Sequence, residues 1–589
     1  MIFTMAKTLR HNHLRTQCGI CSQGLLPGDL FTPLLGTDPK TGSGSYLGRG
    51  VYPTYPHTSV NLDDRSFCWA SNCYQCAKVP EAVGLHSICL SVFKEHYKAE
   101  DSIDRLWATV GQKNLWNGAP CLHLDRESEV EMDLVRQKAA SYGVNLLGRL
   151  PAELIHMIYK YSEDAVFWRC ILALSLAKQL SLSQQCMTLQ SHSIPLCNVL
   201  AWERGESVAV RSDECSPYIR LTLDCRGIRK IERFQERPSY EPAFSNKEAF
   251  VFACESEVKD IVVILKFNVL RLQLPSHIRG FQVWDTPSPP LLEDCEFHGR
   301  VSQSMQLRTI DLHAVTGLTF FFSHSKLYAV HAHTRKNPHA TRTFERLSET
   351  RRANAVSVYL PVPKDEEIIA IVIRLRSSLE GGQSTAQKPF FLFRTKLAGD
   401  IAIGPYRSGA HKDVVIGQSS PRLFVYNSSD VGPATVFGTH PRKQHGNSVS
   451  PSFPHPRFSN PPINYHANIS SAPLENVVIV WVRENENQYC HGILLEYSNG
   501  AQRALGDYRV GNDLPGTDSV KKYMKPSRIC YRGPQDEVAG AGRLSHNFVV
   551  NASDDHDHYH DAAGWTCNSL RGVLEFWFSR ERSVIRIAE

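Results

Sequence analysis

The chain has 589 residues, a length that exceeds what one hydrophobic core organises and predicts about three to four domains. Its net charge of +6 and pI near 8.5 are modest for this size and do not favour a nucleic-acid partner. No run of 18 apolar residues and no apolar signal core occur, so we expect an intracellular protein of cytoplasm or nucleus, with no membrane partner. In a reducing compartment the 17 cysteines are thiols or metal ligands.

A cysteine- and histidine-rich segment occupies residues 17–100, after a basic tail at residues 1–16. Zinc takes four tetrahedral thiolate or imidazole ligands, and pairs separated by two residues place two ligands on one side of the ion. The segment therefore predicts a zinc-finger-like module with a structural zinc ion, similar to treble-clef or RING-like fingers. The expected ligands are two such pairs, the second just before a predicted helix: Cys18, Cys21, His86 and Cys89.

A further pair, Cys73 and Cys76, leaves the ligand set open. It could replace the second pair around the same ion, or build a second site with Cys68 or His57. Three closely spaced pairs in one segment are more than chance predicts, so we expect one or two zinc ions in this module.

Residues 101–195 are predicted to be helical, and the clearest helix follows Leu150-Pro151. Proline suits the first helical turn, where its missing N–H costs nothing, and Glu153 lies near the positive end of the helix dipole. The apolar residues recur at helical spacing and form one stripe. These residues are Leu150, Leu154, Ile155 and Ile158.

This segment, about residues 146–185, resembles an F-box, a helical module that docks on the adaptor subunit of a cullin ubiquitin ligase. Val166, Phe167, Trp168 and Leu172 could supply its second helix, whereas the family's closing Trp-x-x-Leu turn has no good copy after Leu180. The resemblance implies that the chain binds this adaptor through Leu150, Pro151, Leu154, Ile155 and Ile158. The alternative is an ordinary helical hairpin that connects the zinc module to the rest of the chain.

From about residue 200 the apolar pattern changes to short runs rich in β-branched and aromatic residues, separated by turn signals. We expect a β-rich domain at residues 200–435, a disordered linker or insertion at residues 436–473, and a β-rich segment at residues 474–589. Asn499-Gly500 predicts a type I′ hairpin turn. The predicted fold class is thus multidomain α+β, with a large sandwich- or barrel-like C-terminal region.

Several candidate chemistries are weaker. The Asp/His run at residues 554–561 reads as a solvated loop rather than a metal site, because it lacks a defined ligand geometry. No serine-hydrolase elbow, P-loop or Rossmann fingerprint occurs, so we expect no catalytic residues. Four aromatic residues could form a floor for a sugar or peptide, although strand aromatics are more often core. They are Trp481, Tyr497, Tyr508 and Trp577.

The whole layout resembles an uncharacterised filamentous-fungal family of F-box-like proteins. The matching segments are residues 281–287, 318–324, 394–400 and 500–506. This family implies no known activity. The F-box resemblance implies a substrate-recognition subunit of a ubiquitin ligase, whose β region binds a protein or glycan target. The alternative is a lectin-like or peptide-binding module with a structural zinc site and no role in ubiquitin transfer.

Overall fold

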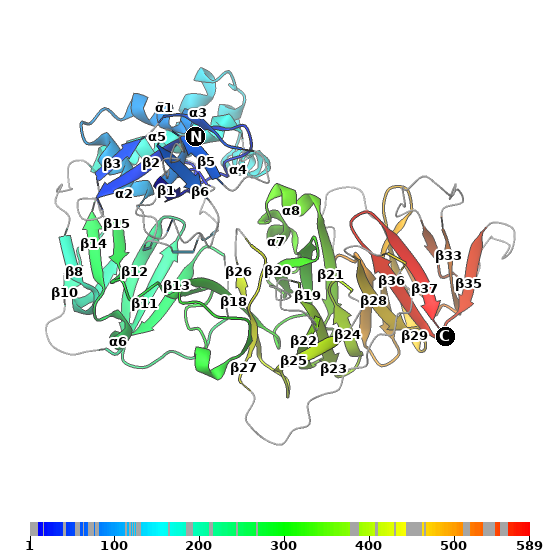
Figure 1. Cartoon of the computed structure of the whole chain (residues 1–589). Coiled ribbons are helices and arrows are strands. Elements are labelled where there is room, and N and C mark those ends of the chain that lie inside the picture. Colours follow the sequence, from blue (N-terminus) through cyan, green and yellow to red (C-terminus); the bar gives the residue numbers. More distant parts are fainter. Residues whose placement is uncertain are drawn as a thin grey trace, which may run out of the picture. The chain divides into compact units, whose positions relative to one another are not determined.

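The computed structural model places most of the chain (Figure 1). It describes residues 10–15, 17–38, 43–46, 48–53, 59–62, 64–68, 76, 82–111, 115–116, 119–120, 122, 124, 131–162, 165–183, 192–210, 216–242, 246–266, 269–376, 388–406, 410–428, 432–442, 462–463, 467–510, 519–533, 548–553 and 564–588.

Two compact units divide the chain. The first comprises residues 1–289 and 302–306, and the second comprises residues 290–301 and 307–589. The described residues are mostly strand, and the longer helices lie before residue 200, which confirms the predicted change of pattern. Helices beyond residue 200 in the described ranges have at most five residues. No helix within the described part of the chain has both the length and the apolarity needed to cross a membrane.

The N-terminal part of the first unit contains two small sheets. One has the order β1-β6-β5, and in the other β2 pairs with β3, β4 and β7. Because Arg10–His13 is strand β1, paired in parallel with β6, the prediction of a tail up to residue 16 is wrong for these residues. The other strands are β2 (Leu30–Asp38), β3 (Ser43–Tyr46), β4 (Gly50–Val51), β5 (Ser59–Leu62), β6 (Arg65–Cys68) and β7 (Ala82–His86).

In the described residues between β7 and β8, five helices and one 3₁₀ turn are present. They are α1 (Ser87–His96), α2 (Ser102–Val110), α3 (Met132–Ser141), η2 (Leu147–Arg149), α4 (Ala152–Tyr161) and α5 (Val166–Ser183). Helix α5 is apolar on nearly all sides, which fits its position in the fold, since two of its sides are buried against different elements. Its Ala173 and Ala177 pack with α1 and the small sheets, whereas Trp168 and Ile171 pack against α3 and α4. A helical segment is therefore present where the sequence predicts one.

The rest of the first unit is a β region. Its strands form a sheet of order β8-β14-β15 and a second of order β10-β9-β12-β11-β13-β16, which share one apolar core. The elements are β8 (His192–Pro195), η3 (Leu196–Asn198), β9 (Val199–Glu203), β10 (Ala209–Val210), β11 (Tyr218–Asp224), β12 (Gly227–Phe234), β13 (Ala249–Cys254), α6 (Glu255–Val258), β14 (Val262–Lys266), β15 (Val269–Gln273) and β16 (Gln282–Trp284).

The second unit is almost entirely antiparallel β. Its sheets include β20-β19-β21, β24-β23-β22-β25, β31-β30-β29-β32, β28-β36-β37 and β34-β33-β35. The elements are η4 (Leu292–Asp294), β17 (Glu296–His298), β18 (Met305–Asp311), β19 (Gly317–Ser323), β20 (Lys326–His333), α7 (Thr341–Glu345), α8 (Glu349–Ala353), β21 (Ala355–Pro361), β22 (Ile368–Arg376), β23 (Phe390–Thr395), β24 (Gly399–Ile403), β25 (His411–Gly417), β26 (Leu423–Ser428), β27 (Phe437–His440), β28 (Asn468–Pro473), β29 (Val477–Glu484), β30 (Cys490–Tyr497), β31 (Gln502–Gly506), β32 (Ser519–Met524), β33 (Arg528–Arg532), β34 (Val549–Asn551), β35 (Trp565–Ser569), β36 (Val573–Phe578) and β37 (Ser583–Ala588).

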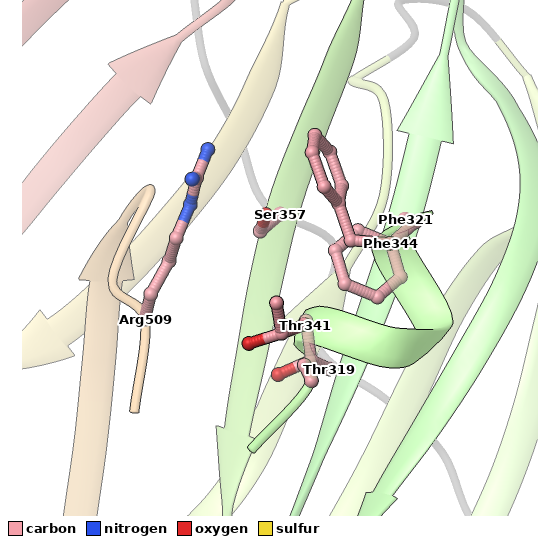
Figure 2. Close-up of a pocket in the computed structure, with 7 residues that line it drawn as sticks. Thr319, Phe321, Thr341, Phe344, Ser357 and Arg509 are labelled. Atoms are coloured by element: carbon pink, nitrogen blue, oxygen red, sulfur yellow. The ribbon is translucent and has the colours of Figure 1, made fainter. Parts of the chain in front are cut away.

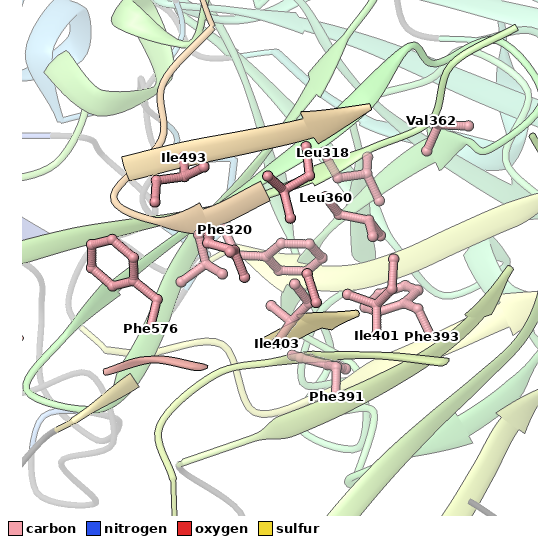
Figure 3. Close-up of a cluster of buried hydrophobic side chains, with 14 of the residues drawn as sticks. Leu318, Phe320, Leu360, Val362, Phe391, Phe393, Ile401, Ile403, Ile493 and Phe576 are labelled. Carbon is pink, nitrogen blue, oxygen red and sulfur yellow. The ribbon is translucent and has the colours of Figure 1, made fainter. Parts of the chain in front are cut away.

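One apolar core runs through this second unit (Figure 3). It joins Phe320 and Phe391, from before residue 436, to Ile493 and Phe576, from after residue 473. The sequence leaves open whether the strands before and after residues 436–473 form one domain or two. In the structure they belong to one unit, because they bury their apolar faces together. The division falls near residues 290–307, inside the predicted 200–435 domain.

Two local predictions also need correction. The prediction of a disordered linker or insertion at residues 436–473 is wrong for its two ends, which are β27 and β28 with mostly buried side chains. Residues 443–461 and 464–466 lie outside the described part of the chain. The hairpin between β30 and β31 is confirmed, but its turn is not type I′. Only Gly500, at φ +83°, has the positive φ that a type I′ turn requires at both central residues.

Candidate metal centre

Four predicted ligands converge in the N-terminal module. Cys18 and Cys21 lie in a tight turn before β2, closed by the amide of Ser22, which donates to the Cys18 carbonyl at 2.7 Å. His86 is the last residue of β7, and Cys89 lies in the first turn of α1. Strand β7 pairs antiparallel with β2, and this pairing carries the second pair back to the first.

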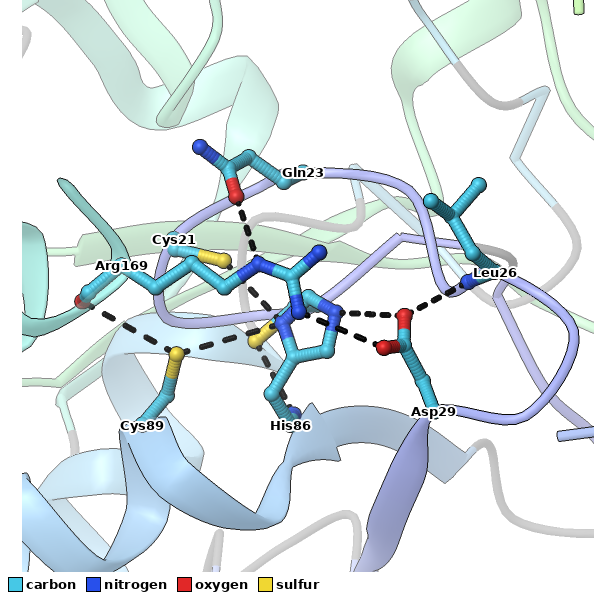
Figure 4. A network of polar contacts seen from close by, with 8 residues as sticks. Cys21, Gln23, Leu26, Asp29, His86, Cys89 and Arg169 are labelled. Atoms are coloured by element: carbon cyan, nitrogen blue, oxygen red, sulfur yellow. Dashed lines mark hydrogen bonds and ion pairs between the residues drawn. The ribbon is translucent and has the colours of Figure 1, made fainter. Parts of the chain in front are cut away.

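The four ligand atoms lie within 4.8 Å of one another, and each residue is at most 1% exposed (Figure 4). The Nδ1 atom of His86 lies 3.3 Å from the Cys21 sulfur and 3.9 Å from the Cys89 sulfur. The backbone amide of His86 donates to the Cys18 sulfur at 3.3 Å. These four side chains can therefore hold a metal ion, with Nδ1 as the imidazole ligand atom.

A second layer of polar groups orients the histidine. The Nε2 atom of His86 lies 3.3 Å from the Asp29 carboxylate, although the alignment falls short of a hydrogen bond. Asp29 also accepts from the Leu26 amide at 2.8 Å and from the Arg169 guanidinium at 3.3 Å. A carboxylate behind a ligating histidine fixes the ring orientation and raises its basicity as a ligand. Arg169 additionally donates to the Gln23 side chain at 2.9 Å.

The electrostatics of the cluster favour a cation. Burial opposes ionisation of Cys18, but contacts from Cys21, Cys89 and His86 lower its pKa well below the ordinary value. The contact with the Cys18 thiolate in turn raises the pKa of Cys21 and, still more, that of Cys89. Three buried thiols cannot ionise together without compensating positive charge, and a divalent ion would supply it.

The alternative ligands behave differently. Cys73 and His57 lie outside the described residues. Cys76 is not in this cluster but lies beside His11 and Cys68, so the idea that it replaces the second pair is wrong.

Sequence reasoning missed Asp29 and Arg169, which are distant in sequence and belong to no ligand motif. The Asp/His run at residues 554–561 also falls outside the part of the chain that the structure describes.

Helix α4 carries an exposed apolar face. Leu154 is 44% exposed and Ile158 39% exposed, as a docking helix requires. Ile155 is fully buried among Val135 and Trp168, so its predicted contact with an adaptor is wrong: this side of the helix packs on its own unit. Pro151 is exposed and Leu150 is half-buried.

Two further residues of this face are not among those predicted from the sequence: Met157, at 54% exposure, and Tyr161, at 78%. With Leu154 and Ile158 they follow the spacing i, i+3, i+4 and i+7, which places all four on one side of a helix. We call these four residues the α4 face.

A small apolar hollow lies in the second unit (Figure 2). Arg509 at its edge pairs with Asp507 at 3.0 Å, so its charge is already compensated. The aromatic floor considered from the sequence does not form a surface, because Trp577, Tyr497 and Tyr508 are buried. The residues lining the hollow are Thr319, Phe321, Ala340, Thr341, Phe344, Ser357 and Arg509.

Neither the protein-family models nor the curated proteins contain a match to this chain.

A buried histidine near the hollow, His331, predicts acid sensitivity. His331 contacts the Thr343 hydroxyl at 2.9 Å, and its ring lies 4.6 Å from that of His333. Burial, together with the neighbouring His333, lowers the pKa of His331 to about 3. The unfolded state, with a pKa near 6.5, therefore binds the proton more readily, and stability is lost as the pH falls below about 6.5.

We expect this histidine to remove about 2 kcal/mol of stability between pH 6.5 and pH 5, at about 1.4 kcal/mol per pH unit. His331→Gln should reduce the pH dependence of the second unit's free energy of unfolding by that amount. Thermal unfolding of both proteins at pH 7.5, 6.5 and 5 measures it. Parallel pH profiles would show that His331 does not cause the sensitivity.

Proposed function

We propose that the chain is a substrate-recognition subunit of a cullin-type ubiquitin ligase, with a zinc-stabilised N-terminal module, an adaptor-binding helix and a β-rich region for the target. The observation that carries the proposal is the α4 face. The proposal assigns the chain binding roles and no catalytic step.

The chemistry of the first cluster supports zinc as the metal. Three thiolates and one imidazole are a ligand set typical of structural zinc, and soft thiolates select against magnesium and calcium. All four ligands are buried, which fits a closed structural site better than a catalytic site with a position for water or substrate. Bound zinc would fasten the Cys18–Cys21 turn to β7 and the start of α1.

The α4 face supports the docking role. Large apolar side chains exposed at i, i+3, i+4 and i+7 are the anchors with which an amphipathic helix binds a hydrophobic groove. The opposite side of α4 is held by Ile155 and by the Trp168 indole, which donates to Ser162 at 2.9 Å. A helix anchored on one side can present the other side rigidly, which lowers the entropic cost of binding.

The second candidate is a peptide- or glycan-binding module without a role in ubiquitin transfer. The hollow lined by Phe321 and Phe344 favours it, because apolar concavities with a few polar groups are typical binding sites. In the first proposal this same β region binds the target, so the two candidates differ only in the task of α4.

The test is binding of the intact protein to a purified cullin-ligase adaptor. We expect the native protein to bind and the double variant Leu154→Asp, Ile158→Asp to bind at least tenfold more weakly, because two buried charges replace apolar anchors. Leu182→Asp is the matched control: Leu182 lies on α5, is 70% exposed, and is outside the α4 face.

The control variant should bind like the native protein, and circular dichroism should show all three proteins equally folded. Absence of binding by the native protein, or equal binding by the double variant, would refute adaptor docking and leave the second candidate.

A further inference from the structure

A second cysteine–histidine cluster lies in the same module and shares no residue with the first. It consists of His11, Cys68 and Cys76. His11 is on β1, Cys68 is the last residue of β6, and Cys76 follows β6 in the chain. The parallel pairing of β1 with β6 places His13 opposite Cys68 and so brings the N-terminal strand alongside this cysteine.

The geometry of the cluster suits a metal ion. The His11 Nδ1 atom lies 3.1 Å from the Cys76 sulfur, and the three ligand atoms lie within 4.8 Å of one another. Tetrahedral zinc, with bonds of about 2.0–2.3 Å, holds its ligand atoms about 3.3–3.8 Å apart. Only small movements would therefore bring all three atoms to bonding distance.

The surroundings also suit a structural ion. Cys68 is 4% exposed and Cys76 7% exposed, while His11 is half-buried. The sheet that carries His11 and Cys68 has three strands of four residues each, too short for much stability of its own. A metal ion would cross-link β1 to the segment that contains Cys76 and supply the missing stability.

We propose that His11, Cys68 and Cys76 form a second metal site, which takes a thiolate-preferring divalent ion such as zinc. The N-terminal module then holds two ions in separate clusters. The site adds a ligand, His11, that lies outside the segment in which the sequence predicts zinc binding. This proposal is independent of adaptor docking by α4.

The test is the metal content of the full-length protein, purified under reducing conditions and measured by inductively coupled plasma mass spectrometry. We expect two zinc ions per chain in the native protein. The double variant Cys68→Ser, Cys76→Ser should hold one, because the four ligands of the first cluster are unchanged. A native content of one ion or none, or an unchanged content in the Cys68/Cys76 variant, would overturn the proposal.

A second measurement needs no variant. Cysteine alkylation of the native protein, mapped by peptide mass spectrometry, should be slow at Cys68 and Cys76 and at least tenfold faster after a chelator is added. Cys254, which lies outside both clusters, should react at the same rate in both conditions. Equal rates at Cys68 and Cys76 with and without chelator, or a disulfide between them in fresh reduced protein, would contradict a metal site.

Discussion

Removal of the metal from the first cluster is expected to unfold the N-terminal module. Structural zinc contributes about 10–16 kcal/mol to the folding of small zinc modules, which exceeds the total stability of most domains. Chelation removes the cation that compensates the negative charge of the buried thiolates, and Cys89→Ser removes one of the ligands that hold this cation. Hydrogen exchange by mass spectrometry should show protection lost in β7 and α1, while the second unit keeps its protection.

The matched control for this prediction is Cys254→Ser. Cys254 is in the same unit, and its sulfur contacts the Ser256 hydroxyl, a contact that a serine can keep. Its exchange pattern should equal that of the native protein. If β7 and α1 stay protected in the chelated protein, the cluster does not hold a structural ion.

The metal centre is also connected to the helix that we propose binds the adaptor. The Cys89 sulfur lies 3.9 Å from the Arg169 carbonyl oxygen, and the Arg169 side chain donates to Asp29, whose carboxylate lies behind the histidine ligand. Arg169 is on α5, next to Trp168, which packs against Ile155 of α4. Loss of the metal should therefore also weaken adaptor binding, although no residue of the α4 face contacts the cluster.

In the second unit the largest effect is expected for Phe391→Ala. The Phe391 side chain is fully buried, and its ring lies 5.0 Å from that of Phe437 and 5.7 Å from that of Phe320. Removing a buried phenyl ring costs about 3–5 kcal/mol, through lost apolar burial and the cavity that remains. Urea unfolding of the second unit, followed by circular dichroism of its strands, should show a lower midpoint urea concentration. The slope of the unfolding free energy against urea concentration should be unchanged.

The matched control is Val520→Ala on β32. Val520 is 49% exposed, so its truncation should change stability by less than about 0.5 kcal/mol. A Phe391→Ala effect as small as that of the control would mean that the core around β23 does not hold the unit together.

The sequence was sufficient wherever the physics is local. The spacing of two residues identifies Cys18 with Cys21, and His86 with Cys89, as pairs of candidate metal ligands, because that spacing alone places two ligands side by side. Proline followed by an apolar stripe locates α4, since helical periodicity is a property of about ten consecutive residues. The change from helical to strand patterns near residue 200 is visible for the same reason.

What the sequence did not determine depends on residues that meet only after folding. The β2–β7 pairing selects His86 and Cys89 rather than Cys76 as partners of the first pair, and the parallel β1–β6 pairing brings His11 to Cys68. Likewise only packing decides that Ile155 faces inward while Leu154 and Ile158 stay exposed.

The domain boundary likewise depends on residues that meet only after folding. The polar segment at residues 436–473 leaves open whether its flanking strands form one domain or two, and the apolar core runs through the strands on both of its sides. Composition reports the local tendency of a segment to bury itself, whereas a domain is defined by which distant strands share one core. Long-range strand pairing carries no local signature, and the tertiary structure alone assigns it.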